Sequence, residues 1–216
     1  MRLTYSFRFG ARHREMYKPY HILAFLMATA CGGGGGESVG SGIDPRLARI
    51  DIYETQRVRV LGDPGAGVMG MMATPEPAIP TSGQAHFDGF VTMRVENPAQ
   101  VLVLYGDSAI AVDFAGNTVT GTLDNFFGTT GRGNVADYAG EVTIDGGTLR
   151  DGVSIDYSGV LTAGSDRLVL GGTADGQFLN QPVSAIAVTD LEAGVIHNGT
   201  LFDATLIIVG EGSVTP

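Results

Sequence analysis

From Gln84 onward, apolar and polar residues alternate in short runs, which is the pattern of a half-buried β-strand. In residues 109–114, Ile110 and its apolar neighbours two residues apart alternate with small or polar side chains. In residues 118–123, threonines take every second position. The residues between these two runs, 115–117, contain Gly and Asn, which favour a tight turn. The pattern therefore predicts a β-hairpin over residues 109–123.

About eight such runs follow one another along the chain. They cover residues 90–95, 109–114, 118–123, 138–145, 153–162, 168–178, 183–188 and 201–209. Strands with one apolar face must close into a barrel or stack as two sheets to bury that face. We predict an all-β fold, an eight-stranded antiparallel up-and-down β-barrel over residues 83–216, with a β-sandwich as the alternative.

The last run is apolar on both faces, because residues 206–209 read Leu-Ile-Ile-Val. Its outer face therefore needs a cover, for which we expect residues 44–61. Asp44-Pro45 is typical of a helix start, with Asp as N-cap and Pro at the first helical position. The apolar residues between Ile50 and Leu61 fit a strand equally well, so helix and strand both remain open. Gly and Pro recur through residues 62–82, which predicts a loop, and we interpret 44–82 as one irregular segment.

Residues 20–30 form a short apolar stretch that ends in small residues, directly before Cys31 and five glycines. This stretch is too short to span a bilayer and is typical of an export signal. Small residues ending in Cys resemble the lipobox of bacterial lipoproteins, which implies lipidation of Cys31 after removal of residues 1–30. The Gly/Ser-rich residues 31–43 would then be a flexible tether on the lipidated cysteine. Translation from Met16 instead of Met1 would leave an equally good leader.

The charge of the chain is concentrated in the part after the leader. Residues 1–31 hold five of the 13 basic residues but only one of the 23 acidic ones, so the remainder has a formal charge near −14. Such a surface repels nucleic acid and anionic headgroups, and we expect no nucleic-acid partner. With one cysteine, the chain forms no intramolecular disulfide.

Several of the predicted strands carry a pattern known from one family. The segments are Val112-Asp113-Phe114, Val119-Thr120-Gly121-Thr122-Leu123, Tyr157-Ser158-Gly159, Gly172 to Phe178, and Ala185. Together they resemble the barrel domain of transferrin-binding protein B-like lipoproteins, over roughly residues 89–209. The resemblance implies an eight-stranded barrel on the outer membrane that binds a protein or a haem-type ligand. It also implies that residues 44–82 are a vestigial handle domain, in a single-barrel form of the family.

The sequence offers no catalytic or metal-binding constellation. After the leader, His86 and His197 are the only histidines, and no cysteine or second histidine stands at ligand spacing. No nucleophile–base pair is recognisable, so we expect a protein that is not an enzyme. We expect no cofactor, and haem enters only as a ligand that the resemblance implies.

Two segments are candidates for partner binding. Residues 124–134 read as a hairpin loop that holds Phe126, Phe127 and Arg132, and aromatic and arginine side chains anchor protein interfaces. The hypothesis is that these three residues form a partner-binding tip. Met69, Met71 and Met72 lie together in the Pro-flanked loop, and methionine suits adaptable contact surfaces. Packing of these methionines over the barrel mouth is the alternative.

These observations lead to one expected function and one alternative. The expected function is a lipid-anchored outer-membrane protein, on the cell surface or the periplasmic face, that captures a protein or a small apolar ligand. Its first partner would be membrane lipid, through acylated Cys31. The alternative is a periplasm-facing structural or envelope-assembly lipoprotein without a ligand.

Overall fold

The computed structural model describes residues 44–148 and 152–215. Its elements are α1 (Pro45–Leu61), β1 (Gly62–Asp63), β2 (Val68–Met69), the 3₁₀ helix η1 (Glu76–Ala78), β3 (Gln84–Val95), β4 (Leu102–Asp113), β5 (Thr118–Thr129), β6 (Val135–Asp137), β7 (Ala139–Thr148), β8 (Val153–Ala163), β9 (Asp166–Leu179), β10 (Ala185–His197) and β11 (Thr200–Thr215). The predicted leader, Cys31 and the glycine tether lie outside the described residues.

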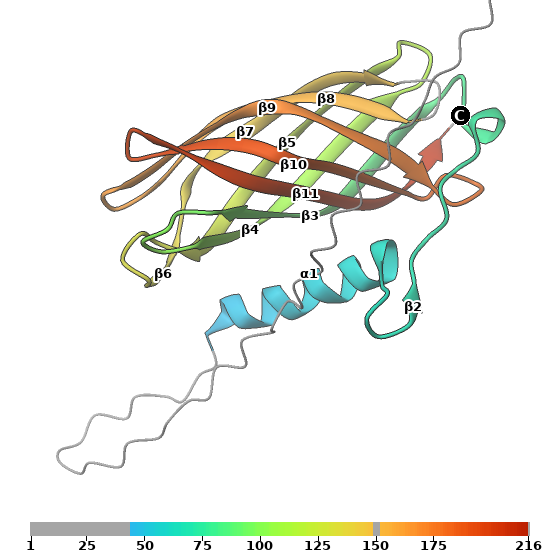
Figure 1. The fold of residues 1–216 in the computed structure, drawn as a ribbon. Helices are drawn as coiled ribbons and strands as arrows, with labels where there is room; N and C mark the ends of the chain where they lie inside the picture. Colours follow the sequence, from blue (N-terminus) through green and yellow to red (C-terminus); the bar gives the residue numbers. More distant parts are fainter. Residues whose placement is uncertain (1–43, 149–151, 216) are drawn as a thin grey trace, which may run out of the picture. The chain divides into compact units, whose positions relative to one another are not determined.

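Strands β3–β5 and β7–β11 form a closed antiparallel up-and-down barrel (Figure 1), whereas β1 and β2 pair with each other in a separate two-stranded sheet. β3 pairs with both β4 and β11, and the pairing of β4 with β5 completes the circle. This arrangement confirms the predicted eight-stranded up-and-down barrel and excludes the sandwich. The hairpin predicted at residues 115–117 is the β4–β5 turn.

The short strand β6 is the one addition to the eight barrel strands. It pairs with the last residues of β5, whereas β7 pairs with the first half of the same strand. Between the two pairings the register of β5 shifts, and Asn125 has a φ of 50°. A residue inserted at such a bulge reverses which side of the wall the following side chains face.

The barrel interior is filled by its own side chains. Phe178 lies between Phe87 and Phe114, with ring centroids 6.2 and 5.3 Å apart, in one buried cluster contributed by all eight barrel strands. Ile79, from the linker before β3, packs against the same cluster. We call the end of the barrel that Ile79 covers the linker end. The opposite end, which carries the loops 96–101, 130–134, 164–165 and 198–199, is called the hairpin end.

Residues 45–61 form a helix, which settles the alternative that the sequence left open. The Asp44 carboxylate caps the helix by accepting from the Arg46 N–H at 3.0 Å, and Pro45 fits the first turn because it has no N–H to satisfy. At the other end, Gly62 has a φ of 78° and donates its N–H to the Val58 carbonyl. Local capping thus fixes both ends of α1.

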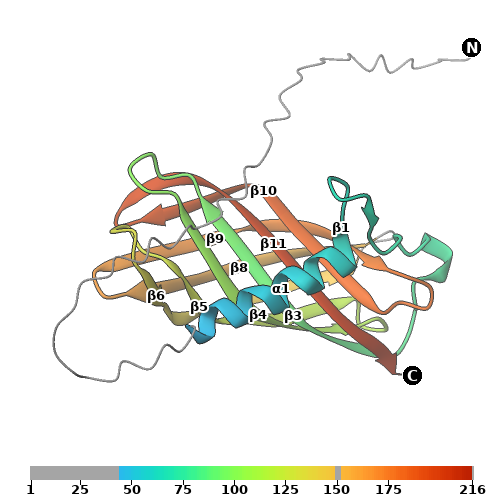
Figure 2. The same ribbon diagram turned by 90° about the horizontal axis from the view of Figure 1, so that it is seen from below.

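Helix α1 packs on the outside of the barrel, across β3, β10 and β11 (Figure 2). Tyr53 and Val60 are its buried residues, and they share a cluster with Phe90 and Val209 on the outer face of the wall. Ile207 packs against this cluster. The prediction that residues 44–61 cover the outer face of residues 206–209 is therefore confirmed.

In the described ranges, no helix combines the length and the apolar character needed to cross a membrane.

Candidate functional site

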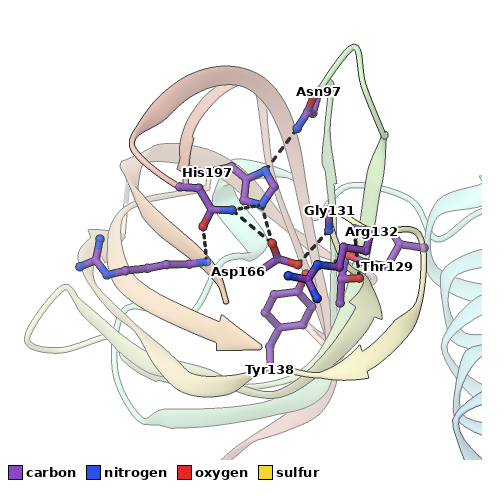
Figure 3. A network of polar contacts seen from close by, with 10 residues as sticks. Asn97, Thr129, Gly131, Arg132, Tyr138, Asp166 and His197 are labelled. Carbon is purple, nitrogen blue, oxygen red and sulfur yellow. Dashed lines mark hydrogen bonds and ion pairs between the residues drawn. The ribbon is translucent and has the colours of Figure 1, made fainter. Parts of the chain in front are cut away.

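A buried polar network closes the hairpin end of the barrel (Figure 3). Asp166, at the start of β9, accepts hydrogen bonds from the Gly131 N–H at 2.9 Å and from Nδ2 of Asn198 at 3.2 Å. Nε2 of His197 lies 3.3 Å from the same carboxylate, and Nδ1 of His197 lies 3.3 Å from the Asn97 amide nitrogen. Asn97, Gly131 and Asn198 come from three of the four loops at this end, and Asp166 directly follows the fourth loop, residues 164–165.

The electrostatics of the network favour an ionised Asp166. Burial by itself raises the pKa of this carboxyl, but the hydrogen bonds from the Gly131 N–H, Asn198 and His197 outweigh it and hold the pKa below its usual value. Because the Asn97 amide donates to Nδ1, Nε2 of His197 is left to donate to Asp166. The network thus fixes the loop that contains Gly131 over the barrel mouth.

An Asp–His pair is also the base of many hydrolases, and here the pair lies in a network of hydrogen bonds between loops. A catalytic base needs a nucleophile within hydrogen-bond reach. The polar partners of the His197 ring in the described structure are Asn97, Asp166 and Asn198, and none is a nucleophile. Tyr138, which is buried nearby, donates to the Thr129 carbonyl at 2.9 Å. The hydrogen bonds of this network therefore connect the loops at the hairpin end of the barrel.

A second polar cluster fastens α1 to the barrel wall. The Tyr53 hydroxyl donates to Asp107, which also accepts from the Asn125 amide at 3.0 Å. Arg49 lies 3.4 Å from Asp107, and its guanidinium carbon is 4.5 Å from the centre of the Phe127 ring. Burial and the bond to Asp107 raise the pKa of Tyr53 to about 12. These contacts hold α1 against the barrel wall.

The most exposed apolar feature of the barrel wall is a row of four side chains near the hairpin end. Val160, Val169, Ile196 and Leu201 stand on β8, β9, β10 and β11 and are direct cross-strand partners. Their neighbours along each strand face the core, so these four face outward. The exposed fractions of Val160, Ile196 and Leu201 are 37%, 40% and 69%. We call these four residues the outer-wall row.

The wall around the outer-wall row is acidic. Six exposed carboxylates on β7–β11 make no ion pair with another described residue: Glu141, Asp145, Asp156, Asp175, Glu192 and Asp203. Glu141 is the cross-strand partner of Val160, and Asp203 lies two residues from Leu201. Among the described residues of these five strands, Arg167 supplies the single guanidinium. The wall thus combines an apolar row with an excess of free negative charge.

Helix α1 carries four arginines, and all of them are paired. Each arginine of α1 is paired with a carboxylate: Arg46 with Asp44, Arg49 with Asp107, Arg57 with Glu54, and Arg59 with Glu211. Exposed ion pairs of this kind add little to stability, but they leave no unbalanced positive charge on the helix. Asp51 on α1 and Asp88 on β3 are exposed carboxylates that make no ion pair with a described residue, so free negative charge is not confined to the wall that carries the outer-wall row.

The predicted partner-binding tip at residues 124–134 is wrong. Phe126 and Phe127 lie in β5, and each is 1% exposed. Phe126 belongs to the barrel core and Phe127 to the cluster under α1, so neither is available to a partner. Arg132 is exposed in the turn after β5, and its side chain makes no ion pair with another described residue. The error arises because residues 124–129 continue β5 instead of forming a loop, and α1 covers the outer face on which Phe127 lies.

Met69, Met71 and Met72, the second predicted binding segment, differ in their exposure to solvent. Met69 and Met72 are exposed, whereas Met71 packs against the cluster under α1 and donates its N–H to the Val60 carbonyl at 2.8 Å. The three side chains therefore do not form one contact surface. Partner binding by Met69 and Met72 stays a prediction.

Sequence reasoning missed the outer-wall row and the Asp166–His197 network. The row did carry a signal, because Val160, Val169 and Ile196 are apolar residues at positions whose period-two pattern predicts an outward side chain. Their adjacency depends on strand register, which no short motif encodes. Asp166 and His197 are 31 residues apart and share no motif that would pair them.

In residues 44–148 and 152–215, no three His, Cys, Asp or Glu side chains are grouped as metal ligands. Comparison with known proteins adds no assignment: no protein-family model matches the chain, and no curated protein matches it. The transferrin-binding protein B-like resemblance therefore stays a prediction.

Proposed function

We propose that this chain is a lipid-anchored binding protein of the bacterial envelope, which captures a protein partner on the outer surface of its barrel. The observation that carries the binding part is the outer-wall row, because three exposed aliphatic side chains and the half-buried Val169 on four adjacent strands form a contiguous patch of the kind that marks interaction sites. The anchoring part rests on the sequence before Cys31 and on the glycines after it.

The packing of the barrel favours a protein over a haem-type or small apolar ligand. Eight-stranded barrels that hold a small ligand keep a cavity between the strands. Here Phe87, Phe114 and Phe178 fill the interior, the linker covers one end, and the Asp166–His197 network covers the other. A partner therefore has access to the outside of the wall, where a protein surface fits better than a small molecule.

The anchor is tested by metabolic labelling with an alkyne fatty acid in a bacterial host, followed by membrane fractionation. The full chain is expected to incorporate the label and to sediment with the outer membrane. The Cys31→Ser variant is expected to lose the label and to stay in the inner membrane with an uncleaved leader or to appear in the soluble fraction. An unlabelled wild-type chain in the soluble fraction would contradict the proposed anchoring.

A further inference from the structure

The outer-wall row lies across the strands at one level of the barrel. Neighbouring strands are about 4.8 Å apart, so four strands give a row of about 14 Å. This width matches one amphipathic segment of a partner, since a helix with its side chains is about 10 Å across. Leu201 is the most exposed of the four, and its Cδ1 lies 3.3 Å from where a Cβ would stand at Gly194. The absence of a side chain at Gly194 leaves room for the end of the Leu201 side chain, which lies over this glycine.

The charges around the row define what kind of segment fits it. Glu141 stands in line with the row beside Val160, and Asp203 and Glu192 lie toward the middle of the barrel from Leu201 and Ile196. These carboxylates are exposed and make no ion pair within residues 44–148 and 152–215, so binding a cation breaks no ion pair of the described structure. Complementary charge at the rim of an apolar patch speeds association and selects the partner. Arg167 is the one opposing charge on this part of the wall.

From these contacts we propose that the outer-wall row, with Glu141, Glu192 and Asp203, binds a cationic amphipathic segment of another protein. Aliphatic or aromatic side chains of that segment lie on Val160, Val169, Ile196 and Leu201, and its lysines or arginines face the carboxylates. This rests on the proposed function only in taking the barrel as a protein-binding module, because lipidation plays no part in the contact. The anchor and the binding surface can therefore fail separately.

The test uses the full chain, purified from the cells that express it, and two synthetic peptides of about 18 residues. One peptide is an amphipathic helix of leucine and lysine, and the other has serine in place of leucine at unchanged charge. Binding is measured by fluorescence anisotropy at about 50 mM and about 300 mM sodium chloride. The leucine–lysine peptide is expected to bind the wild type at least about tenfold more tightly than the serine–lysine peptide.

Variants of the protein separate the row from the rest of the surface. Ile196→Thr with Leu201→Thr is expected to weaken binding of the leucine–lysine peptide by about tenfold or more, whereas the matched change Ile52→Thr on the exposed face of α1 leaves it unchanged. Glu141→Gln with Asp203→Asn is expected to weaken binding and to reduce its salt dependence, and Asp51→Asn with Asp88→Asn serves as its control. Circular dichroism and thermal unfolding verify that each variant is folded.

Three results would overturn the proposal. Equal affinity for the two peptides would show that net charge alone drives binding. Unchanged affinity in the folded Ile196→Thr/Leu201→Thr variant would place the contact elsewhere. A wild-type dimer in analytical ultracentrifugation that this variant dissociates would identify a second copy of the chain as the occupant of the row.

Discussion

Phe126 and Phe127 are adjacent in β5 and lie on opposite sides of the barrel wall, Phe126 facing inward and Phe127 facing α1. Phe126 packs in the barrel core, and Phe127 packs under α1 beside Tyr53, with ring centroids 6.3 Å apart. The extra residue at the Asn125 bulge decides which ring faces inward, because uninterrupted alternation from the buried Leu123 would place Phe127 in the core and Phe126 toward α1. The bulge therefore selects Phe127 as the ring that packs under the external helix.

This relationship predicts different consequences for two similar substitutions. Phe126→Ala is expected to reduce the free energy of unfolding of the whole barrel by about 3–5 kcal/mol, because it opens a cavity in the core. Phe127→Ala is expected to release α1 while the barrel stays folded. Hydrogen exchange of residues 45–61 and denaturant unfolding measure the two effects. Full protection of α1 in Phe127→Ala would contradict the account.

The hydrogen bond from the Tyr53 hydroxyl to Asp107 predicts a loss of stability at high pH. The pKa of Tyr53 is about 12 in the folded protein, above the ordinary value of 10, so folding favours the neutral phenol. Its contribution is fully present below pH 10 and falls as the pH rises from 10 to 12, by at most about 3 kcal/mol.

Tyr53→Phe tests this contribution directly. The free energy of unfolding of the wild type is expected to exceed that of Tyr53→Phe by about 1 kcal/mol near neutral pH, since one hydrogen bond to a charged group is lost. The difference should shrink or change sign above about pH 10. A difference that stays constant to pH 12 would show that Tyr53 ionises as readily in the folded as in the unfolded chain.

The network at the hairpin end predicts the opposite pH dependence. The pKa of Asp166 lies below its ordinary value, so its contribution is present above the unfolded pKa near 3.8 and is lost as the pH falls through the lower folded value. Asp166→Asn is expected to cost about 1–3 kcal/mol at neutral pH and progressively less in acid. Urea unfolding from about pH 7 to about pH 3 measures this. The exposed change Asp175→Asn is the control and should stay within about 0.5 kcal/mol of the wild type throughout.

The loop over the barrel mouth leaves no room for a side chain at Gly131. A Cβ there would stand 3.0 Å from Cε1 of His197 and 3.2 Å from Oδ1 of Asp166, so Gly131→Ala must displace the loop or the network. We expect a loss of about 1 kcal/mol in unfolding free energy and faster hydrogen exchange of the Gly131 amide, which donates to Asp166.

Gly171→Ala is the matched control for this substitution. A Cβ at Gly171 has the Tyr157 carbonyl at 3.8 Å as its nearest neighbour, which is an ordinary contact. We therefore expect a neutral or slightly stabilising effect, because alanine lowers the entropy of the unfolded chain. Equal costs for the two changes would show that the contacts of Gly131 with the network are not what restricts it.

The barrel could be predicted from the sequence because apolar and polar residues alternate along each strand that has one face in the core and the other in solvent. The cover over residues 206–209 was predictable for the same reason, since a strand that is apolar on both faces needs two partners. The role of Phe126 and Phe127 was not predictable, because the bulge at Asn125 changes the register inside what reads as a loop. The outer-wall row depends on the pairing of four strands, which alternation alone does not specify.

Protease accessibility on intact cells is the most direct test of the proposed lipid-anchored binding module in its surface-facing form, the first of the two orientations that the sequence leaves open. A C-terminally tagged chain is compared with its Cys31→Ala variant, with and without permeabilisation of the outer membrane. The account predicts digestion of the wild type on intact cells and no surface digestion of Cys31→Ala. Protection of the wild type until the outer membrane is opened would contradict surface capture and favour a periplasm-facing role.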